Sequence, residues 1–263
     1  METILFGALK GVGTAEVSDS LNRPLNRNLE EPNNVWEVAQ LLTERYRDFD
    51  HHNRKNPLDE LLFIICSTKT DVQKYRNTHK ALKQKFPRFR QIAAASESEI
   101  AAAIVDGGLY NQKAKVIKKI FNELEQKFGR PTLAPLRYMS DDECETILLS
   151  LPGVGKKTAR CILMYSFKRE VFPVDTHCWR ITQRLGWITP TCHNGRCYPV
   201  DMDRLQEVIP PSLRRSLHVN LISLGREICT SRSPACSLCP LNNLCPKYGT
   251  AMRKHAVSDT SDG

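Results

Sequence analysis

The sequence predicts an all-α fold. Apolar residues recur at helical spacing in one segment after another, and no stretch alternates between polar and apolar residues as a strand would. Two further observations organise the chain: a glycine-rich turn between two expected helices, and four cysteines crowded near the C-terminal end. With 263 residues, the chain is long enough for one large domain or two smaller ones with real cores.

The two ends of the chain lack helical periodicity. Residues 1–34 and 250–263 are predicted to be a disordered arm and a disordered tail. Between them, Asn34 and Ser96 are expected N-caps, and Gly225 follows the last expected helix. The apolar spacing predicts helices at 35–49, from 57 into the late sixties, 71–86, 97–105, 111–128, 141–149, 156–167, 176–185, 202–208 and 213–224.

A glycine-rich turn joins the helices expected at 141–149 and 156–167. Gly153 and Gly155 permit positive φ and the close approach of another backbone. Free N–H groups at the start of the second helix, with the positive end of its dipole, make a ready site for a phosphate. Helix, Gly-x-Gly turn and helix outline a helix-hairpin-helix, which grips a nucleic-acid backbone without reading its sequence. The candidate backbone-binding residues are Gly153, Val154, Gly155 and Lys156.

Lys157 lies in the first turn of the second of these helices. Apolar residues from Ala159 to Phe167 point in every direction, so this helix is expected to be buried nearly all round. Burial and the positive end of the dipole both disfavour an ammonium, and we expect a lowered pKa for Lys157. A neutral amine is a nucleophile able to form a Schiff base. The alternative is that Lys157 binds a DNA phosphate, as Lys156 is also able to do.

Asp175 precedes the helix expected at 176–185. Its position is ideal for an N-cap, which is one interpretation. The other is that Asp175 is an active-site carboxylate, because reactions that build positive charge on a sugar ring use such groups. His177, two residues later, either contacts a phosphate or packs within the helix.

Two loops between the expected helices stand out. Residues 67–70 (STKT) end the apolar helix opened by Pro57, and residues 107–111 (GGLYN) place a bulky Leu109 after a glycine pair. An apolar side chain on a glycine-rich turn is able to wedge between the bases of a bent duplex. The alternative is that Leu109 anchors its loop in the core.

Four cysteines lie within 17 residues, spaced Cys-x6-Cys-x2-Cys-x5-Cys. In a reducing compartment, clustered thiolates need a cation. Zinc usually takes two close pairs of cysteines, whereas a [4Fe–4S] cluster more readily accepts four from one irregular loop. The spacing therefore favours iron–sulfur over zinc. The four residues are Cys229, Cys236, Cys239 and Cys245. In contrast, Cys192, His193 and Cys197 are three candidates in a short loop and are not predicted to form a metal site.

The composition narrows the class of partner. Lys and Arg number 38 against 29 Asp and Glu, and the formal net charge of +9 favours a polyanion, nucleic acid first. No run of 18 apolar residues exists, so no membrane span is expected. The N-terminus has no basic region before its apolar patch, and we expect no signal peptide and a reducing compartment for the cysteines.

Taken together, these motifs resemble the endonuclease III branch of the helix-hairpin-helix DNA glycosylases. The matching stretches are LPGVGKKTA at 151–159, VDTH at 174–177, GLYNQKA at 108–114 and the cysteine spacing. The resemblance covers roughly residues 35–249. It implies two α-helical domains with DNA in the cleft between them.

One implied domain is a six-helix domain at about 51–169 that contains the helix-hairpin-helix at about 141–167. The other is an iron–sulfur cluster domain built from 35–50 plus 170–249. In the family a damaged base is flipped out of the duplex, and we expect a monomer that binds double-stranded DNA containing a damaged base or an abasic site. A cytoplasmic, nucleoid-associated location is expected if the chain is bacterial.

The resemblance also assigns roles to residues. Lys157 matches the Schiff-base lysine, which attacks the sugar C1′, releases the base and allows β-elimination at the 3′ phosphate. Asp175 matches the carboxylate that supports the developing charge and helps to activate the lysine. The four cysteines match the ligands of a [4Fe–4S] cluster, whose implied role is structural and DNA-binding.

One stretch departs from the family pattern. The family usually has a Gln in the loop matching residues 67–71, where that Gln fills the gap left by the flipped base. This chain reads STKTD, one residue shorter, with Lys69 near that place. The family's usual substrates, oxidised pyrimidines, are expected with this departure in view. The alternatives are a monofunctional glycosylase acting on mismatched or alkylated bases, and a non-catalytic iron–sulfur DNA-binding protein.

Overall fold

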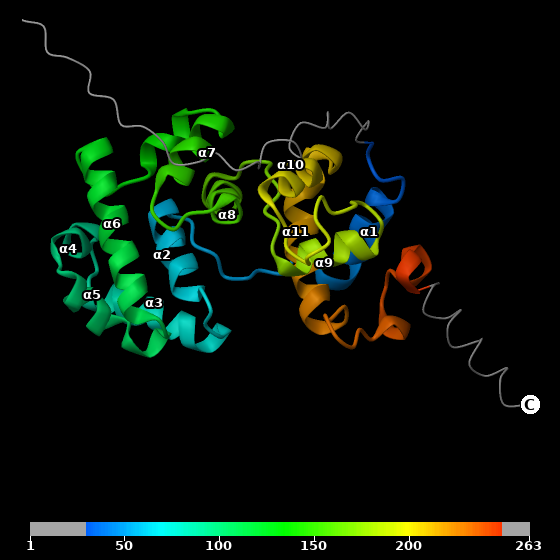
Figure 1. The fold of residues 1–263 in the computed structure, drawn as a ribbon, viewed down its shortest axis with the longest axis horizontal. Coiled ribbons are helices and arrows are strands. Elements are labelled where there is room, and N and C mark those ends of the chain that lie inside the picture. The colour runs from blue at the N-terminus through cyan, green and yellow to red at the C-terminus, as the bar shows by residue number, and fades with distance from the viewer. Residues whose placement is uncertain (1–29, 249–263) are drawn as a thin grey trace, which may run out of the picture.

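The computed structural model describes residues 30–248 (Figure 1). This part of the chain contains eleven α-helices and four short 3-10 helices, with no strand, which confirms the all-α fold class. The predicted disordered tail at 250–263 and all but the last few residues of the predicted arm at 1–34 lie outside the described residues.

The helices follow one another with short connections. In chain order they are α1 (Val35–Tyr46), α2 (Pro57–Ser67), α3 (Val72–Lys85), α4 (Phe89–Ala94), α5 (Glu97–Ala103), α6 (Tyr110–Phe128), α7 (Asp141–Ser150), α8 (Lys156–Phe167), α9 (Thr176–Arg184), α10 (Pro199–Val208) and α11 (Pro211–Glu227). The 3-10 helices are η1 (Val105–Gly107), η2 (Ala134–Tyr138), η3 (Cys236–Leu238) and η4 (Asn242–Leu244).

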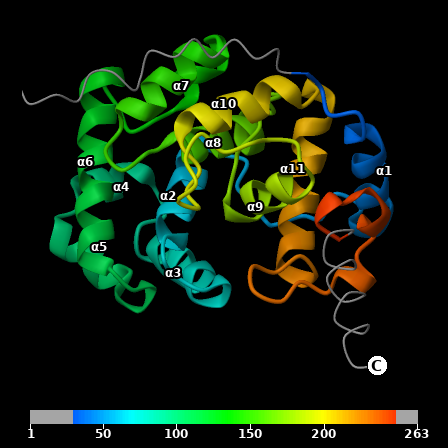
Figure 2. The same cartoon turned by 45° about the vertical axis from the view of Figure 1, so that its right-hand side comes forward.

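The described residues bury two separate hydrophobic clusters. One is built from helices α2 to α8, and the other from α1, α9, α10, α11 and the C-terminal loop (Figure 1). Helix α1 joins the second cluster by packing on α11, although the two helices lie far apart in the sequence. The C-terminal loop lies beside α1 and the end of α11 in both views (Figure 2). From this arrangement we propose that 51–169 is one domain and that 35–50 plus 170–249 is the other.

Local caps explain where several helices begin. The Asn56 side chain accepts hydrogen bonds from the N–H groups of Leu58 and Asp59, and Pro57 occupies the first helical position of α2. Ser96 forms a capping box with Glu99, which confirms Ser96 as an N-cap. These side chains satisfy N–H groups that a helix cannot bond internally.

Asn34 is not the predicted side-chain cap of α1. It is the residue before the helix, but its Oδ1 accepts a hydrogen bond from Trp187 Nε1 at 2.8 Å instead. The far end of α1 also differs from the sequence prediction. The helix stops at Tyr46, three residues early, because Arg47 and Asp48 adopt left-handed backbone conformations.

Two further differences concern single helices. The segment predicted to hold six helices holds seven, because α4 spans six residues and is too short to show a periodic pattern. Helix α11 runs on through Gly225 to Glu227, although the prediction ended it before this glycine. Gly225 is required there by a neighbouring side chain, His177, as described below.

Candidate functional site

A cavity of about 430 Å³ lies where the two hydrophobic clusters meet. From the first cluster it receives side chains of α2, α3 and α8, and from the second it receives side chains of α9 and α11. Lys157 and Asp175 both line it, so the structure brings the two predicted catalytic residues together from different clusters. His177 lines the same cavity.

Lys157 occupies the first turn of α8. Every residue of this helix from Ala159 to Ser166 is buried, as the sequence predicted. Cys161 and Tyr165, one and two turns further along, line the cavity beside Lys157. The Lys157 amine therefore lies at the cavity, at the start of a helix that is otherwise mostly buried.

The predicted direction of the Lys157 pKa is wrong. Its pKa is raised by Cys161 first, and by the carboxylates of Asp175 and Glu60, against the lowering effect of burial. Burial raises the pKa of the Cys161 thiol to about 11, so Cys161 is uncharged at neutral pH. The two carboxylates are then the groups that hold the ammonium. In the free protein Lys157 is therefore protonated and has to lose a proton before it acts as a nucleophile.

Asp175 is the N-cap of α9. Its Oδ1 accepts hydrogen bonds from the N–H groups of His177 (2.9 Å) and Cys178 (2.8 Å), which leaves Oδ2 outside the cap. Burial alone would raise the pKa of Asp175, but His218, the Cys178 N–H, His177 and Lys157 together lower it. Asp175 is consequently an ionised carboxylate at neutral pH. It caps the helix and faces the lysine, so the two interpretations made from the sequence do not exclude each other.

Glu60 is a residue of this site that the sequence analysis missed. It is completely buried on α2, where Oε1 accepts a hydrogen bond from Asn53 Nδ2 (2.5 Å) and Oε2 accepts one from the Arg54 N–H (2.6 Å). Burial raises the pKa of Glu60 in spite of these hydrogen bonds and of Lys157. The available signal was a pair of acids, Asp59 and Glu60, in the otherwise apolar run LDELLFIIC, where at least one acid is expected to face the core.

His218 is the second residue that the sequence analysis missed. It is buried on α11, lines the cavity, and donates from Nδ1 to the carbonyl of Pro173 at 2.8 Å. Burial lowers its pKa to about 4 despite the opposing effect of Asp175, so it is neutral at physiological pH. Nothing in the sequence of α11 marks His218 as a residue of the same cavity as Lys157.

The predicted hairpin is present between α7 and α8. Gly153 has φ of +74°, as predicted, and a Cβ there would lie 3.1 Å from Val116 Cγ1. Gly155 does not have the expected positive φ; it is the extended N-cap of α8 with φ of −99°. A Cβ on Gly155 would meet nothing within 4 Å, so the chain itself imposes no need for glycine there. Val154 between them is buried.

The Lys156 side chain is engaged inside the protein. Its Nζ lies 2.7 Å from both carboxylate oxygens of Asp203 on α10. The phosphate contact predicted for Lys156 stays a prediction, and in the free protein the amine has a carboxylate partner. Anion binding by the backbone N–H groups at the start of α8 likewise stays a prediction.

The two predicted DNA-facing loops lie side by side. Lys69 and Leu109 are both exposed and both adopt left-handed conformations with φ of 50°. Leu109 is 42% exposed, which rules out the alternative that it anchors its loop in the core. Thr70 Oγ1 donates to the Gly107 carbonyl at 2.7 Å. The buried Lys113 adds further bonds between the same loops.

His177 is half-buried against α11. Its Nδ1 lies 3.1 Å from Arg180 Nη2, and its ring lies directly over the Gly225 backbone. Burial lowers the pKa of His177, although Asp175 opposes this. The ring therefore packs against a helix, and the residue also borders the cavity, while the phosphate contact stays a prediction.

The four predicted cysteines surround one cavity of about 350 Å³. Within residues 30–248, no three His, Cys, Asp or Glu side chains converge as the ligands of a single ion do. The cavity instead gives the four sulfur atoms room for a larger group. Arg184 Nη1 lies 3.0 Å from Cys229 Sγ, and Arg232 and Lys247 also line the cavity, so cations offset the charge of thiolate ligands. The donor set and its surroundings fit an iron–sulfur cluster.

Two other features concern the loop at 188–200 and the helices of the described residues. Cys192 and His193 are exposed, and they form no metal-ligating group with Cys197 in the described part of the chain. Across the same residues, we find no helix with the length and apolar character needed to cross a membrane.

Comparison with known proteins identifies the motifs. Residues 62–197 match the HhH-GPD superfamily of base excision DNA repair proteins, and residues 229–245 match the iron–sulfur binding domain of endonuclease III. The second match covers all four cysteines, and the C-terminal loop is therefore the [4Fe–4S] cluster loop. The first match contains the hairpin, Lys157 and Asp175.

Whole-chain comparisons agree. Endonuclease III of Thermotoga maritima is 32% identical over 217 residues, which cover 81% of this chain and 93% of that protein. The Arabidopsis thaliana DNA glycosylase/AP lyase ROS1 is 29% identical over 62% of this chain and 13% of its own length. A trapped endonuclease III–DNA covalent intermediate shares the fold with a TM-score of 0.69 and 26% identity, covering 83% of this chain and 97% of that chain. The chain is thus a DNA-binding glycosylase of base excision repair and belongs to the endonuclease III family.

Proposed function

We propose that the protein is a bifunctional DNA glycosylase and AP lyase. The observation that carries the proposal is the convergence of Lys157 and Asp175 in one cavity between the two hydrophobic clusters. A lysine beside an ionised carboxylate supplies a nucleophile and a group able to accept its proton. A non-catalytic DNA-binding protein has no use for this pair.

The proposed reaction begins with a nucleotide flipped into the cavity, whose volume of about 430 Å³ lies within the range of small-molecule sites. Lys157 gives up a proton, which Asp175 is placed to accept. The neutral amine attacks C1′ of the deoxyribose, and the bond from C1′ to the base breaks. The base leaves with one of the lysine protons. The C1′–O4′ bond then breaks, O4′ takes the second lysine proton, and an imine joins Lys157 to C1′ of the opened sugar.

The lyase step follows from that imine. Loss of a proton from C2′ breaks the C3′–O bond, which cleaves the strand on the 3′ side of the abasic sugar. Water then hydrolyses the imine and regenerates Lys157. Asp175 also stabilises positive charge on the sugar as the base departs. Both residues come from one chain, so we propose that the enzyme acts as a monomer.

The proposed DNA contacts surround this cavity. The hairpin residues Gly153, Val154 and Gly155 present the N–H groups at the start of α8 to a phosphate. Leu109 and Lys69 project from exposed loops, and we propose that Leu109 enters the stack where the nucleotide leaves it. His177 is proposed to contact the strand beside Asp175. The relative trapped as a covalent intermediate with DNA supports DNA binding by this fold.

The proposed substrates are oxidised pyrimidines. A second candidate function is that of a monofunctional mismatch glycosylase. A thermostable thymine-DNA glycosylase shares the fold, with a TM-score of 0.66 and 21% identity. Lys157 favours the bifunctional reaction, because a monofunctional enzyme needs no covalent amine. The ROS1 relative, named as an AP lyase, supports the same choice.

Borohydride trapping on a duplex with one abasic site tests the proposal, because borohydride reduces the imine to a stable amine. We expect an adduct with the wild type and none with Lys157→Ala, while both bind the duplex. Lys127→Ala, an exposed lysine of α6, is the matched control and should form the adduct at the wild-type rate. A Lys157→Ala protein that still traps DNA would refute the assignment. No adduct from any protein would favour the monofunctional candidate, and a panel of lesions would then identify the base removed.

A further inference from the structure

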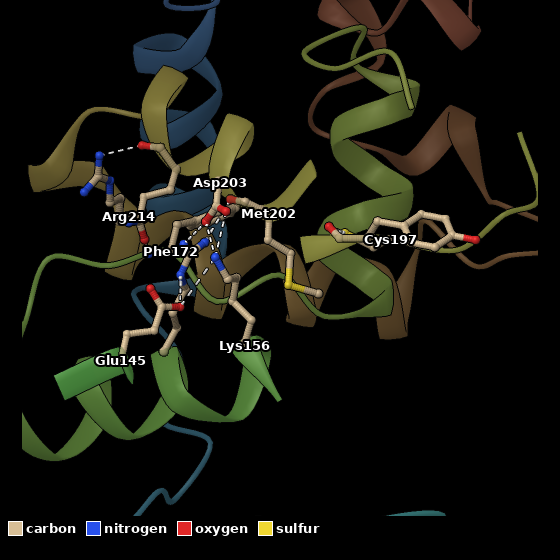
Figure 3. Close-up of polar contacts among 10 residues, drawn as sticks. Glu145, Lys156, Phe172, Cys197, Met202, Asp203 and Arg214 are labelled. Atoms are coloured by element: carbon tan, nitrogen blue, oxygen red, sulfur yellow. Dashed lines mark hydrogen bonds and ion pairs between the residues drawn. The ribbon is translucent and has the colours of Figure 1, made fainter. Parts of the chain in front are cut away.

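Four charged side chains tie the hairpin to the other hydrophobic cluster (Figure 3). Arg160 of α8 is only 2% exposed; its Nε lies 3.2 Å from Glu145 of α7, and its Nη1 donates to the Met202 carbonyl at 2.9 Å. Its Nη2 bonds Asp203 Oδ1. Lys156 Nζ reaches both oxygens of Asp203 at 2.7 Å, and Figure 3 shows these groups meeting between the hairpin and α10.

The network depends on the Asp203 carboxylate. The two cations come from α8 and Glu145 comes from α7, and both helices pack in the first hydrophobic cluster. Asp203 is the carboxylate that reaches Lys156 and Arg160 from the other side, because α10 packs into the second cluster. A buried guanidinium requires such a partner, since an unpaired charge away from water is strongly unfavourable.

The position of this network matters because the active site spans the same boundary. Lys156 precedes Lys157 in the chain, and Arg160 lies one turn further along α8. Asp175, which faces Lys157, caps α9, and α9 packs in the same hydrophobic cluster as α10. Any shift of α8 relative to α10 therefore changes how Lys157 meets Asp175.

We propose that Asp203 is a positioning residue for the lysine chemistry. It holds the first turn of α8 across the boundary through Lys156 and Arg160, so that Lys157 meets Asp175. It also occupies the Lys156 amine, which leaves the phosphate contact of the hairpin to the backbone N–H groups. The inference rests on the proposed function, because its readout is the imine formed by Lys157.

Asp203→Asn tests the proposal, since it keeps the shape of the side chain and removes its charge. Adduct formation is measured with saturating enzyme and borohydride on an abasic duplex, and affinity is measured separately on the same duplex without borohydride. We expect trapping to slow by about tenfold to a hundredfold, as small displacements of reacting groups do. Affinity should stay equal or become tighter, because Lys156 is released toward the phosphates. A merely structural role would lower both.

Three further proteins complete the experiment. Lys156→Met should slow trapping similarly without tightening affinity, and the double variant should trap no more slowly than the slower single variant, because both changes break one contact. Glu207 is an exposed acid on α10, the helix that carries Asp203. Glu207→Gln is therefore the matched control and should behave as the wild type.

The possible failures are distinct. If the wild type forms no adduct, the proposed function is wrong, and the positioning role of Asp203 falls with it. If the wild type traps DNA and Asp203→Asn does so at the same rate, the positioning role is wrong. Should Asp203→Asn fail to fold, Lys156→Met decides alone: wild-type trapping by that variant overturns the proposal.

Discussion

Gly225 and His177 lie so close together that no side chain fits on Gly225. A Cβ built there would lie 2.6 Å from His177 Nδ1 and 2.7 Å from His177 Cβ. The glycine lies inside α11, where it is less favourable than alanine by about 1 kcal/mol. The fold tolerates this because the gap allows His177, at the start of α9, to rest on the α11 backbone beside the cavity.

Gly225→Ala should therefore destabilise the protein and displace His177. Overpacking of this kind lowers the free energy of unfolding by about 1–3 kcal/mol, which urea denaturation would measure. The double variant Gly225→Ala/His177→Ala should recover most of that loss, because truncating the histidine makes room. If the double variant is no more stable than Gly225→Ala, the clash with His177 is not the cause.

Asp175→Asn should slow imine formation more at pH 7 than at pH 9. The raised pKa keeps Lys157 protonated at neutral pH, so the reaction there depends on a group that accepts its proton. Loss of such a group typically slows a reaction by about 10²-fold or more. At higher pH more of the lysine is already neutral, and the deficit should shrink.

Borohydride trapping at a series of pH values would test this, with wild type and Asp175→Asn measured under saturating enzyme. Asparagine retains an acceptor for the α9 cap, so helix content serves as the folding control. A deficit that stays constant from pH 7 to pH 9 would argue that Asp175 supports charge on the sugar and does not receive the lysine proton.

The sequence predicted what depends on local patterns. The hairpin glycines, Lys157, Asp175 and the four cysteines lie in short motifs, and the family resemblance of these motifs assigned their roles. All-α class, the buried α8 and the Ser96 cap also follow from neighbours within a few residues. These features were predictable because helical periodicity and capping are local properties.

Contacts between helices that are distant in the chain were not predicted from the sequence. Glu60 and His218 reach Lys157 and Asp175 from α2 and α11, and periodicity says nothing about which helices meet. The direction of the Lys157 pKa was mistaken for the same reason. The helix dipole and burial can be read locally, but the opposing carboxylates arrive through tertiary packing.

The free energy of unfolding should decrease as the pH is lowered from 7 to 4, partly because of His218. Its pKa is about 4 in the folded protein and 6.5 as an ordinary value, since burial favours the neutral ring. Between these values the unfolded state binds more protons, so stability is fully present above about pH 6.5 and is lost as the pH falls toward 4. The gap corresponds to about 3 kcal/mol.

Urea denaturation at pH 7, 6, 5 and 4 would measure this loss. His218→Gln should be less stable at pH 7 but should lose about 3 kcal/mol less over the range, because glutamine does not titrate. His193→Gln, in an exposed loop, should follow the wild type. Equal losses in wild type and His218→Gln would show that other groups control the acid response.

Lys113→Met should loosen together the two loops that are proposed to face DNA. Lys113 is 4% exposed, and its Nζ donates to the Cys66 carbonyl (2.8 Å), Thr70 Oγ1 (2.8 Å) and the Gly107 carbonyl (2.7 Å). Methionine fills similar space but donates nothing, and the loss of three hydrogen bonds should lower the free energy of unfolding by about 3 kcal/mol. Amide hydrogen exchange should accelerate at 67–71 and 105–110 and not in α11, and DNA affinity should fall because these loops carry Lys69 and Leu109.

Lys115→Met, an exposed neighbour on α6, is the control. Exchange that rises uniformly across the protein would mean that Lys113 supports the fold at large and not these loops.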